Sequence, residues 1–278
     1  MNTPTLAQAL AQAHTLGLAR IDAQLLLLHT AGRAGSDRAW LLAHDTDALS
    51  PQQHAHFLAM CQRRVAGEPV AYLTGHKEFY GLPLHVDARV LDPRPDTETL
   101  VDWALDVVAA LPTPRVLDLG TGSGAIALAL QSQRPTARVL AVDASADALA
   151  VAQANAQRLG LPVQFLQSNW LAGVDGLDGG LFDAIVSNPP YIASADPHLT
   201  ALTHEPLQAL ASGADGLDDI RAIVAQAPSR LAPGGWLLLE HGHDQAEAVQ
   251  ALLTAQGFRQ VQSRDDLAGI ARCTGGCR

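Results

Sequence analysis

Residues 115–130 read R-V-L-D-L-G-T-G-S-G-A-I-A-L-A-L, and this stretch decides the fold. The apolar run at 115–120 predicts a buried strand, and the alanine- and leucine-rich run after the glycines predicts a helix. Gly120, Gly122 and Gly124 stand between them, where glycine permits a tight turn and lets a ligand approach the backbone. The start of the helix offers free N–H groups to an electron-rich group. The stretch predicts a strand–loop–helix unit that binds a ligand at its loop.

Strands and helices continue to alternate after this unit. A serine N-cap at Ser145 and a glycine stop at Gly160 bound one helix. Apolar strands separated by helices predict a parallel sheet covered on both faces, with a terminal antiparallel pair at 258–264 and 269–273. We therefore expect a Rossmann-like, seven-stranded α/β sheet, with the other strands at 115–120, 138–143, 163–168, 182–188 and 236–242.

The first third of the chain has a different pattern. Residues 4–66 carry apolar residues at helical spacing, and Ser50-Pro51 predicts an N-cap followed by proline in the first helical turn. Residues 78–91 predict a β-hairpin around Gly81, and D-P-R-P-D at 92–96 predicts a stiff connector, followed by a helix. We expect a helical N-terminal domain at 1–75, a hairpin and connector at 76–95, and an α/β domain at 96–278. Arg94 and Glu98 are expected to order the connector against the site.

A ligand of the adenosine type fits the rim where the strands end. Asp143 ends the second strand, where a carboxylate can accept hydrogen bonds from two ribose hydroxyls. Asn169 and Trp170 follow the third strand, where an aromatic ring can pack on adenine. The glycine loop also satisfies G-x-G-x-x-A, so a nicotinamide dinucleotide is a rival on local pattern alone. The candidate cofactor residues are Asp118, Gly120, Thr121, Gly122, Ser123, Gly124, Asp143, Asn169, Trp170 and Asn188.

The fourth predicted strand ends in I-V-S-N-P-P-Y at 185–191, on the same rim. The prolines fix their own φ and hold the preceding residues extended, so the carbonyls of Asn188 and Pro189 can face the cavity beside the Asn188 side-chain oxygen. Fixed acceptors of this kind can accept hydrogen bonds from both N–H groups of a planar NH2 group. They thereby orient the group so that the lone pair of its nitrogen points at an electrophile. Tyr191 can pack over that group or near a sulfonium. Asn188, Pro189, Pro190 and Tyr191 are therefore the candidate catalytic and substrate-binding residues.

Composition narrows the class of protein. The 278 residues carry a net charge of −10. Residues 1–85 hold six basic and six acidic side chains and are neutral, and residues 86–278 hold twelve basic and twenty-two acidic side chains. An acidic protein of this kind is not expected to bind the nucleic-acid backbone through an extended basic surface. Three cysteines indicate a reducing compartment rather than a disulfide framework, and neither the cysteines nor His241 and His243 predict a metal site. No apolar run is long enough to span a membrane, so we expect a cytoplasmic protein.

These motifs together resemble the class I S-adenosylmethionine-dependent methyltransferases, and within them the PrmC/HemK family of peptide chain release factor glutamine N5-methyltransferases. The similarity extends along essentially the whole chain, through G-E-P-V-A-Y-L-T-G (67–75), P-R-P-D-T-E (93–98), N-P-P-Y (188–191), E-P-L-Q-A-L (205–210) and L-L-L-E-H-G (237–242). Two features depart from the family. Asn169 stands where the family often has aspartate, and the stretch at 200–206 is shorter than its counterpart.

The resemblance implies an activity and a role for each motif. It implies transfer of a methyl group from S-adenosyl-L-methionine, with S-adenosyl-L-homocysteine as product, to the side-chain amide of the glutamine in the Gly-Gly-Gln loop of class I release factors. Gly120 to Gly124 would line the methionine and ribose part of the cofactor, Asp143 would hold the ribose hydroxyls, and Trp170 would lie beside adenine. The N-P-P-Y residues would hold the glutamine amide, and the helical domain would help dock the factor. A monomer without direct nucleic-acid or membrane binding is expected.

Three alternatives stay open at this stage. The first keeps the cofactor and changes the acceptor to an exocyclic amine of adenine or guanine, which requires an unpaired or flipped base. The second is a nicotinamide-dependent oxidoreductase, which leaves N-P-P-Y unexplained. The third is a release-factor binding module with a vestigial pocket.

Overall fold

The computed structural model describes residues 3–174 and 180–278, and the chain divides into two compact units, Met1–His76 and Lys77–Arg278. The first unit contains five helices in its described part. They are α1 (Leu6–Thr15), α2 (Arg20–Thr30), α3 (Arg38–Ala43), α4 (Pro51–Val65) and α5 (Val70–Thr74). Ser50 caps α4 as predicted, because its side chain accepts a hydrogen bond from Gln53 N while the Gln53 side chain accepts one from Ser50 N. Leu26, Leu27 and Phe57 are fully buried in the core of this unit.

A short hairpin opens the second unit. Strands β1 (His76–Phe79) and β2 (Leu82–His85) pair with each other, and both turn residues, Tyr80 and Gly81, have positive φ (51° and 77°). Two consecutive positive φ values are the geometry of a tight hairpin turn that follows the natural strand twist. The predicted connector leads into a short 3₁₀ turn, η1 (Pro95–Thr97), and helix α6 (Glu98–Val107).

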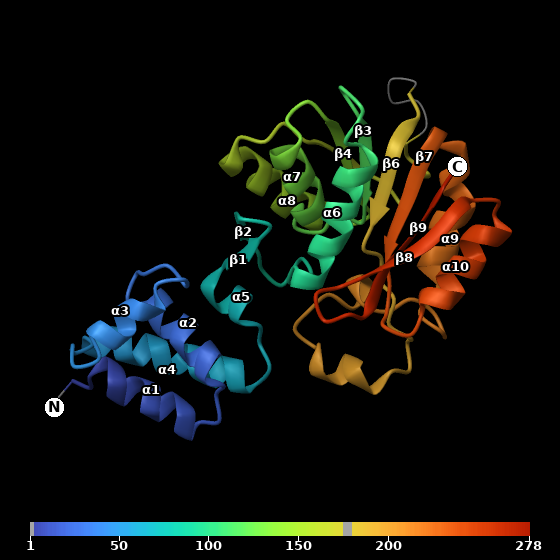
Figure 1. Ribbon diagram of the computed structural model, residues 1–278. Helices are drawn as coiled ribbons and strands as arrows, with labels where there is room; N and C mark the ends of the chain where they lie inside the picture. The colour runs from blue at the N-terminus through green and yellow to red at the C-terminus, as the bar shows by residue number, and fades with distance from the viewer. Residues whose placement is uncertain (1–2, 175–179) are drawn as a thin grey trace. The chain divides into compact units, whose positions relative to one another are not determined.

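A seven-stranded sheet forms the centre of the second unit (Figure 1). Its spatial order is β5-β4-β3-β6-β7-β9-β8, which in chain order of these seven strands is 3-2-1-4-5-7-6. Strands β3 to β7 pair in parallel, and β9 pairs antiparallel with both β7 and β8. The strands are β3 (Arg115–Leu119), β4 (Arg138–Asp143), β5 (Gln164–Gln167), β6 (Phe182–Ser187), β7 (Leu231–Glu240), β8 (Arg259–Asp265) and β9 (Ala271–Cys277).

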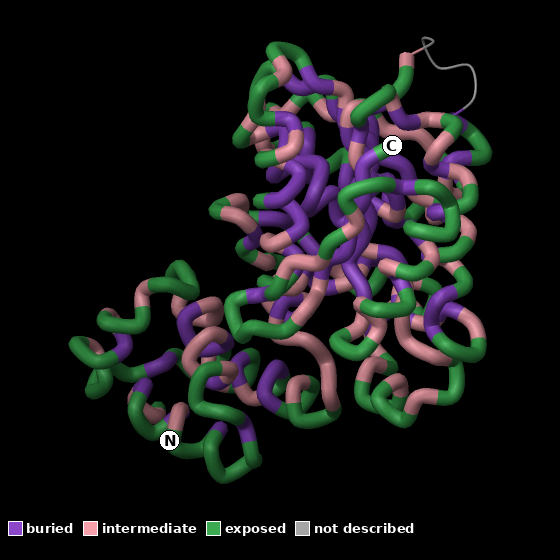
Figure 2. The backbone as a smooth tube through the Cα atoms, turned by 45° about the vertical axis from the view of Figure 1, so that its right-hand side comes forward, coloured by how far each residue is buried: buried purple, intermediate pink, exposed green. Residues whose placement is uncertain are grey.

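Helices cover both faces of this sheet, and the purple core in Figure 2 lies between the layers. Helices α6, α7 (Ala125–Gln133) and α8 (Ala146–Leu159) lie on one face, and α9 (Asp218–Gln226) and α10 (Ala246–Ala255) lie on the other. Side chains alternate along β3, so Leu117 and Leu119 pack into the core with α9 and α10. Val116 and Asp118 face the opposite layer, where Asp118 meets the start of α7.

The predicted Rossmann-like sheet with its terminal antiparallel pair is confirmed, with two differences of detail. Strand β7 begins at Leu231, five residues before the predicted start at Trp236, and the pairing shifts register between Phe182 and Ala184 of β6. A proline and two glycines at 233–235 masked the start of this strand in the sequence. Strand β9 also lies between β7 and β8 and pairs with both, rather than with β8 alone. The periodicity of a strand does not reveal which strands will be its neighbours.

Candidate active site

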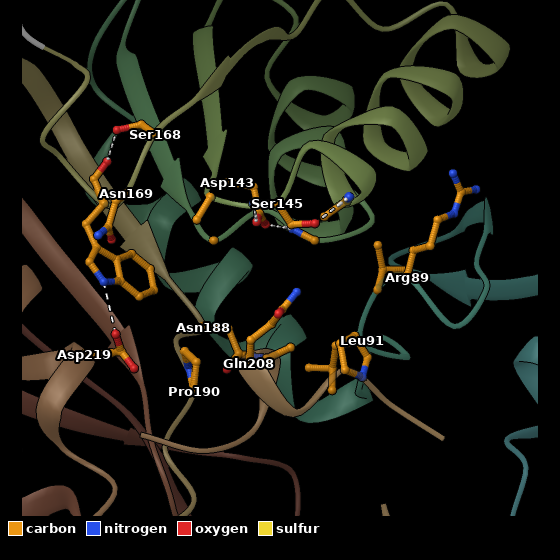
Figure 3. A pocket seen from close by; sticks show the side chains of 18 residues that line it. Arg89, Leu91, Asp143, Ser145, Ser168, Asn169, Asn188, Pro190, Gln208 and Asp219 are labelled. Atoms are coloured by element: carbon orange, nitrogen blue, oxygen red, sulfur yellow. Dashed lines mark hydrogen bonds between the residues drawn. The ribbon is translucent and has the colours of Figure 1, made fainter. Parts of the chain in front are cut away.

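A cavity of about 380 Å³ opens at the carboxyl ends of the parallel strands (Figure 3). This is the edge where the strand order reverses, since β3 has β4 on one side and β6 on the other. Ligands of open α/β sheets bind at such switch points. The cavity brings together seven of the predicted residues: Gly120, Gly122, Asp143, Asn169, Trp170, Asn188 and Pro190.

Asp118 shapes the glycine loop from behind. It is completely buried, so it does not touch a ligand in the cavity, and it acts through the loop instead. Its Oδ2 accepts hydrogen bonds from Thr121 Oγ1 (2.6 Å) and from Ala127 N (3.2 Å) in the first turn of α7. Burial raises the pKa of Asp118 to about 7, although both hydrogen bonds oppose the shift. Thr121, Ser123 and Gly124 also do not line the cavity. They form the scaffold of the loop rather than its ligand-facing surface.

Gly120 lies directly under the ring of Trp170. Its φ is +71°, and a Cβ placed on it would lie 3.2 Å from Trp170 Cζ3. Trp170 itself has a φ of 49°, which is a strained conformation for a bulky side chain. Its indole Nε1 donates to Asp219 Oδ1 (3.1 Å), and Asp219 is fixed in turn by hydrogen bonds with Ser212 Oγ. The glycine beneath the ring, the strained backbone and the hydrogen bond from Nε1 therefore hold the Trp170 ring at the cavity wall.

Asp143 links the glycine loop to the next helix. Its Oδ2 accepts from Gly122 N and its Oδ1 from Ser145 N, both at 2.9 Å. A carboxylate offers about four lone-pair sites, so each oxygen keeps capacity for a further donor. The side chain is thus fixed in place and can still accept hydrogen bonds from two neighbouring hydroxyls of a ligand.

The Asn188 side chain is oriented by a hydrogen bond from Nδ2 to Thr97 Oγ1 (3.2 Å). This bond uses a donor of the amide, whose Oδ1 is an acceptor, and Asn188 and Pro190 both line the cavity. Pro189 is buried behind them. The Tyr191 hydroxyl lies 3.4 Å from Glu240 Oε1 at the end of β7. Of the four predicted catalytic residues, Asn188 and Pro190 line the cavity, and Pro189 and Tyr191 are not among its lining residues.

The connector and the E-P-L-Q-A-L segment (205–210) are tied together across the site. Arg94 Nη2 donates to Glu205 Oε1 (2.5 Å), and Asp92 N donates to Glu205 Oε2 (3.2 Å). Glu205 is buried, and the residues after it, Pro206 and Gln208, line the cavity. Arg94 therefore orders the connector as expected, while Glu98 accepts a hydrogen bond from Tyr80 N and holds the hairpin.

Several residues that line the cavity were not predicted to bind a ligand. Ser145 and Ser168 sit beside predicted residues, and Arg89 to Leu91 come from the segment after the hairpin. Asp219 comes from the first turn of α9, about fifty residues after its partner Trp170. A contact over this separation leaves no local signal in the sequence. Only the E-P-L-Q-A-L motif pointed to the segment that contains Gln208.

The described residues contain neither a candidate metal site nor a candidate membrane span. No group of three or more metal-ligating side chains occurs in residues 3–174 and 180–278. None of the helices in those ranges has the length and apolar character needed to cross a membrane.

The sheet order and the cavity at its switch point are those of the class I methyltransferase fold. Family models match on both units: a methyltransferase small domain at residues 101–215 and a PrmC N-terminal domain at residues 5–75. A release factor glutamine methyltransferase of Bordetella pertussis is 51% identical over 262 residues, covering 94% of this chain and 95% of the relative. One from Burkholderia pseudomallei is 48% identical over 286 residues, covering 99% of both chains. The chain belongs to the release factor glutamine methyltransferase family.

Solved structures agree on the fold. The hMettl16 catalytic domain in complex with the MAT2A 3′UTR hairpin 1 matches with a TM-score of 0.60 at 15% identity, over 84% of each chain. The Thermus thermophilus 16S rRNA N2 G1207 methyltransferase in complex with AdoMet and guanosine matches with a TM-score of 0.55 at 21% identity. That match covers 73% of this chain and 49% of the other. At these identities the likeness concerns the fold alone.

Proposed function

We propose that this protein methylates the side-chain amide nitrogen of the glutamine in the Gly-Gly-Gln loop of class I release factors. The observation that carries the proposal is the fixed amide of Asn188. Its Nδ2 is held by Thr97, so its Oδ1 is presented as an acceptor in the same cavity as the glycine loop, Asp143 and Trp170. The relatives that match nearly the full chain carry the same activity in their names. The same relatives support this acceptor over a nucleic-acid base.

The cavity fits S-adenosylmethionine in size and in its polar groups. Its volume lies in the range of pockets that enclose a small organic ligand. Asp143 accepts from the ribose hydroxyls, the ring of Trp170 packs against adenine, and Gly120 and Gly122 let the methionine part approach the backbone. Asn169 sits beside Trp170 at the adenine end, where its amide serves in place of the aspartate that the family often has. When bound, S-adenosylmethionine supplies a methyl group on a positively charged sulfonium.

The chain itself contributes orientation. Asn188 Oδ1 and the backbone carbonyls of the proline turn accept both N–H groups of the incoming amide, which directs its nitrogen lone pair toward the methyl group. Orientation of this kind removes much of the barrier when the geometry is tight. The nitrogen becomes acidic once it is alkylated, so its proton can leave after the bond has formed. Tyr191 and the buried Pro189 keep the turn rigid. We propose that the enzyme acts in the cytoplasm as a monomer.

Replacing Asn188 with alanine tests this proposal. We expect Asn188→Ala to reduce methylation of a release factor by at least a hundredfold, because it removes the oriented acceptor. Binding of S-adenosylmethionine, measured by calorimetry, should stay within about fivefold of the wild type. Asn169→Ala is the matched control, since it removes an amide at the adenine end and should weaken the cofactor while methylation persists at saturating cofactor. Wild-type turnover in Asn188→Ala would contradict the proposal.

A further inference from the structure

Glu240 is a buried carboxyl group with no role in the reaction described so far. It is the last residue of β7, is 1% exposed, and lies opposite Cys273 of β9 in the sheet register. Its Oε1 lies 3.4 Å from the Tyr191 hydroxyl, which donates to it. Its Oε2 has no hydrogen-bond partner among the described residues. Burying a carboxyl oxygen without a hydrogen-bond partner costs free energy. A buried polar group of this kind in a native structure therefore calls for an explanation, and a role in function is one.

The position of Glu240 connects it to the Tyr191 end of the N-P-P-Y turn, because the Tyr191 hydroxyl donates to its carboxyl group. The other end of the turn is held separately, because Asn188 Nδ2 donates to Thr97 Oγ1 and Thr97 is buried.

The surroundings favour the neutral carboxylic acid. Burial raises the pKa of Glu240 to about 7, and the negative charge of Asp96 raises it further, while Thr97, Tyr191 and Arg272 lower it. Arg272 is shared with Asp266 (3.2 Å) and Asp96 (3.9 Å), so it does not neutralise Glu240 alone.

Three further groups near Glu240 and Tyr191 are the Cys273 thiol, the His241 ring and the Arg94 guanidinium. Burial and the proximity of Glu240 raise the pKa of the Cys273 thiol, so the thiol stays protonated. Burial lowers the pKa of His241, whose ring nitrogens contact Gly242 O and Thr274 Oγ1. Arg94 acts on Tyr191, where burial and Glu240 raise the pKa of the hydroxyl, so this hydroxyl remains a donor.

We propose that Glu240 is a positioning residue, which anchors the Tyr191 hydroxyl and so holds the N-P-P-Y turn to the end of β7. The inference rests on the proposed function and deepens it. A glutamine side chain has the same shape as the neutral acid and keeps an oxygen for Tyr191. An alanine leaves the Tyr191 hydroxyl without this partner and frees the turn.

The test compares Glu240→Gln and Glu240→Ala with Glu247→Ala, an exposed acid in the first turn of α10. We expect Glu240→Gln to keep kcat within about threefold and Glu240→Ala to lose roughly a hundredfold, with the KM for S-adenosylmethionine nearly unchanged. Glu247→Ala should match the wild type. Rescue by glutamine and a loss confined to kcat distinguish positioning from a loss of fold, which thermal unfolding monitors for each variant.

Tyr191→Phe completes a double-mutant cycle. If Glu240 acts through Tyr191, the double variant Glu240→Ala/Tyr191→Phe should be no slower than Glu240→Ala alone. Additive losses, or wild-type kcat in Glu240→Ala, would overturn the positioning role and leave the proposed function intact. A wild-type protein that fails to methylate release factors would overturn both, since the positioning role would then have no reaction to serve.

Discussion

Alanine substitutions at Gly120, Gly122 and Gly124 should destabilise the protein to different extents, because the added methyl group has different neighbours at each position. Each has a positive φ, so alanine at any of them costs about 1–2 kcal/mol of backbone strain. Each substitution also restricts the unfolded chain to the same extent. Differences between the variants therefore report what the added methyl group meets. At Gly122 it meets no described atom within 4 Å, at Gly120 it meets the ring of Trp170 at 3.2 Å, and at Gly124 it meets Leu128 Cδ1 at 3.0 Å and Ala152 Cβ at 3.2 Å.

These contacts give an expected order of stability. Gly122→Ala should destabilise by the strain alone, about 1–2 kcal/mol. Gly124→Ala should add about 1–3 kcal/mol, because helices α7 and α8 must separate. Gly120→Ala should add about 1 kcal/mol, because the ring of Trp170 has to move away from its hydrogen bond with Asp219.

Urea unfolding of the cofactor-free protein, followed by circular dichroism, measures this order. The excess cost of Gly120→Ala over Gly122→Ala should disappear in a Trp170→Ala background, because the added methyl group then has nothing to displace. Gly120→Ala should also shift the tryptophan emission, whereas Gly122→Ala should not. Equal free energies of unfolding for all three variants, or an excess that survives removal of Trp170, would refute this account of the cavity wall.

The remaining predictions concern the cofactor, the Arg94–Glu205 ion pair and pH. Asp143→Ala should weaken S-adenosylmethionine binding by about a hundredfold in calorimetry and leave the KM for the release factor nearly unchanged; equal losses would count against the ribose assignment. Arg94→Met should lower the thermal midpoint, because it leaves the buried Glu205 without its cation, and a midpoint equal to that of the wild type would show that this pair contributes nothing. The contribution of Asp118 and Glu240 to stability should fall as pH rises from about 4 to about 7, because the folded groups keep protons that the unfolded chain has already lost, and should level off above about 7. Asp118→Asn should flatten part of this slope in urea titrations at stepped pH, and an unchanged slope would exclude Asp118 as a source.

Much of the fold was predictable from the sequence, because its signals are local. The Ser50 cap, the glycine stop at Gly160 and the apolar strands around the glycine loop each depend on neighbours in the chain. The start of β7 was missed since Pro233 and two glycines interrupt its pattern. The insertion of β9 between β7 and β8 depends on pairing between distant segments, which periodicity does not encode.

The site was predictable in its motifs and less so in its detail. Asp143 and Asn188 were predicted to share one rim because each follows or ends a strand of the parallel sheet, and both line the cavity. Asp118 was grouped with the ligand-facing residues, but strand alternation turns it away from the cavity to hold Thr121 and Ala127. Asp219 was missed because its role depends on a contact between distant parts of the chain.

The most direct measurement is to incubate the protein with methyl-labelled S-adenosylmethionine and a class I release factor, and to locate the label by fragmentation mass spectrometry. We expect a single methyl group on the side-chain nitrogen of the Gly-Gly-Gln glutamine, with no transfer to a release factor whose glutamine is replaced by alanine. Label on another residue, or on added RNA in preference to the factor, would contradict the account.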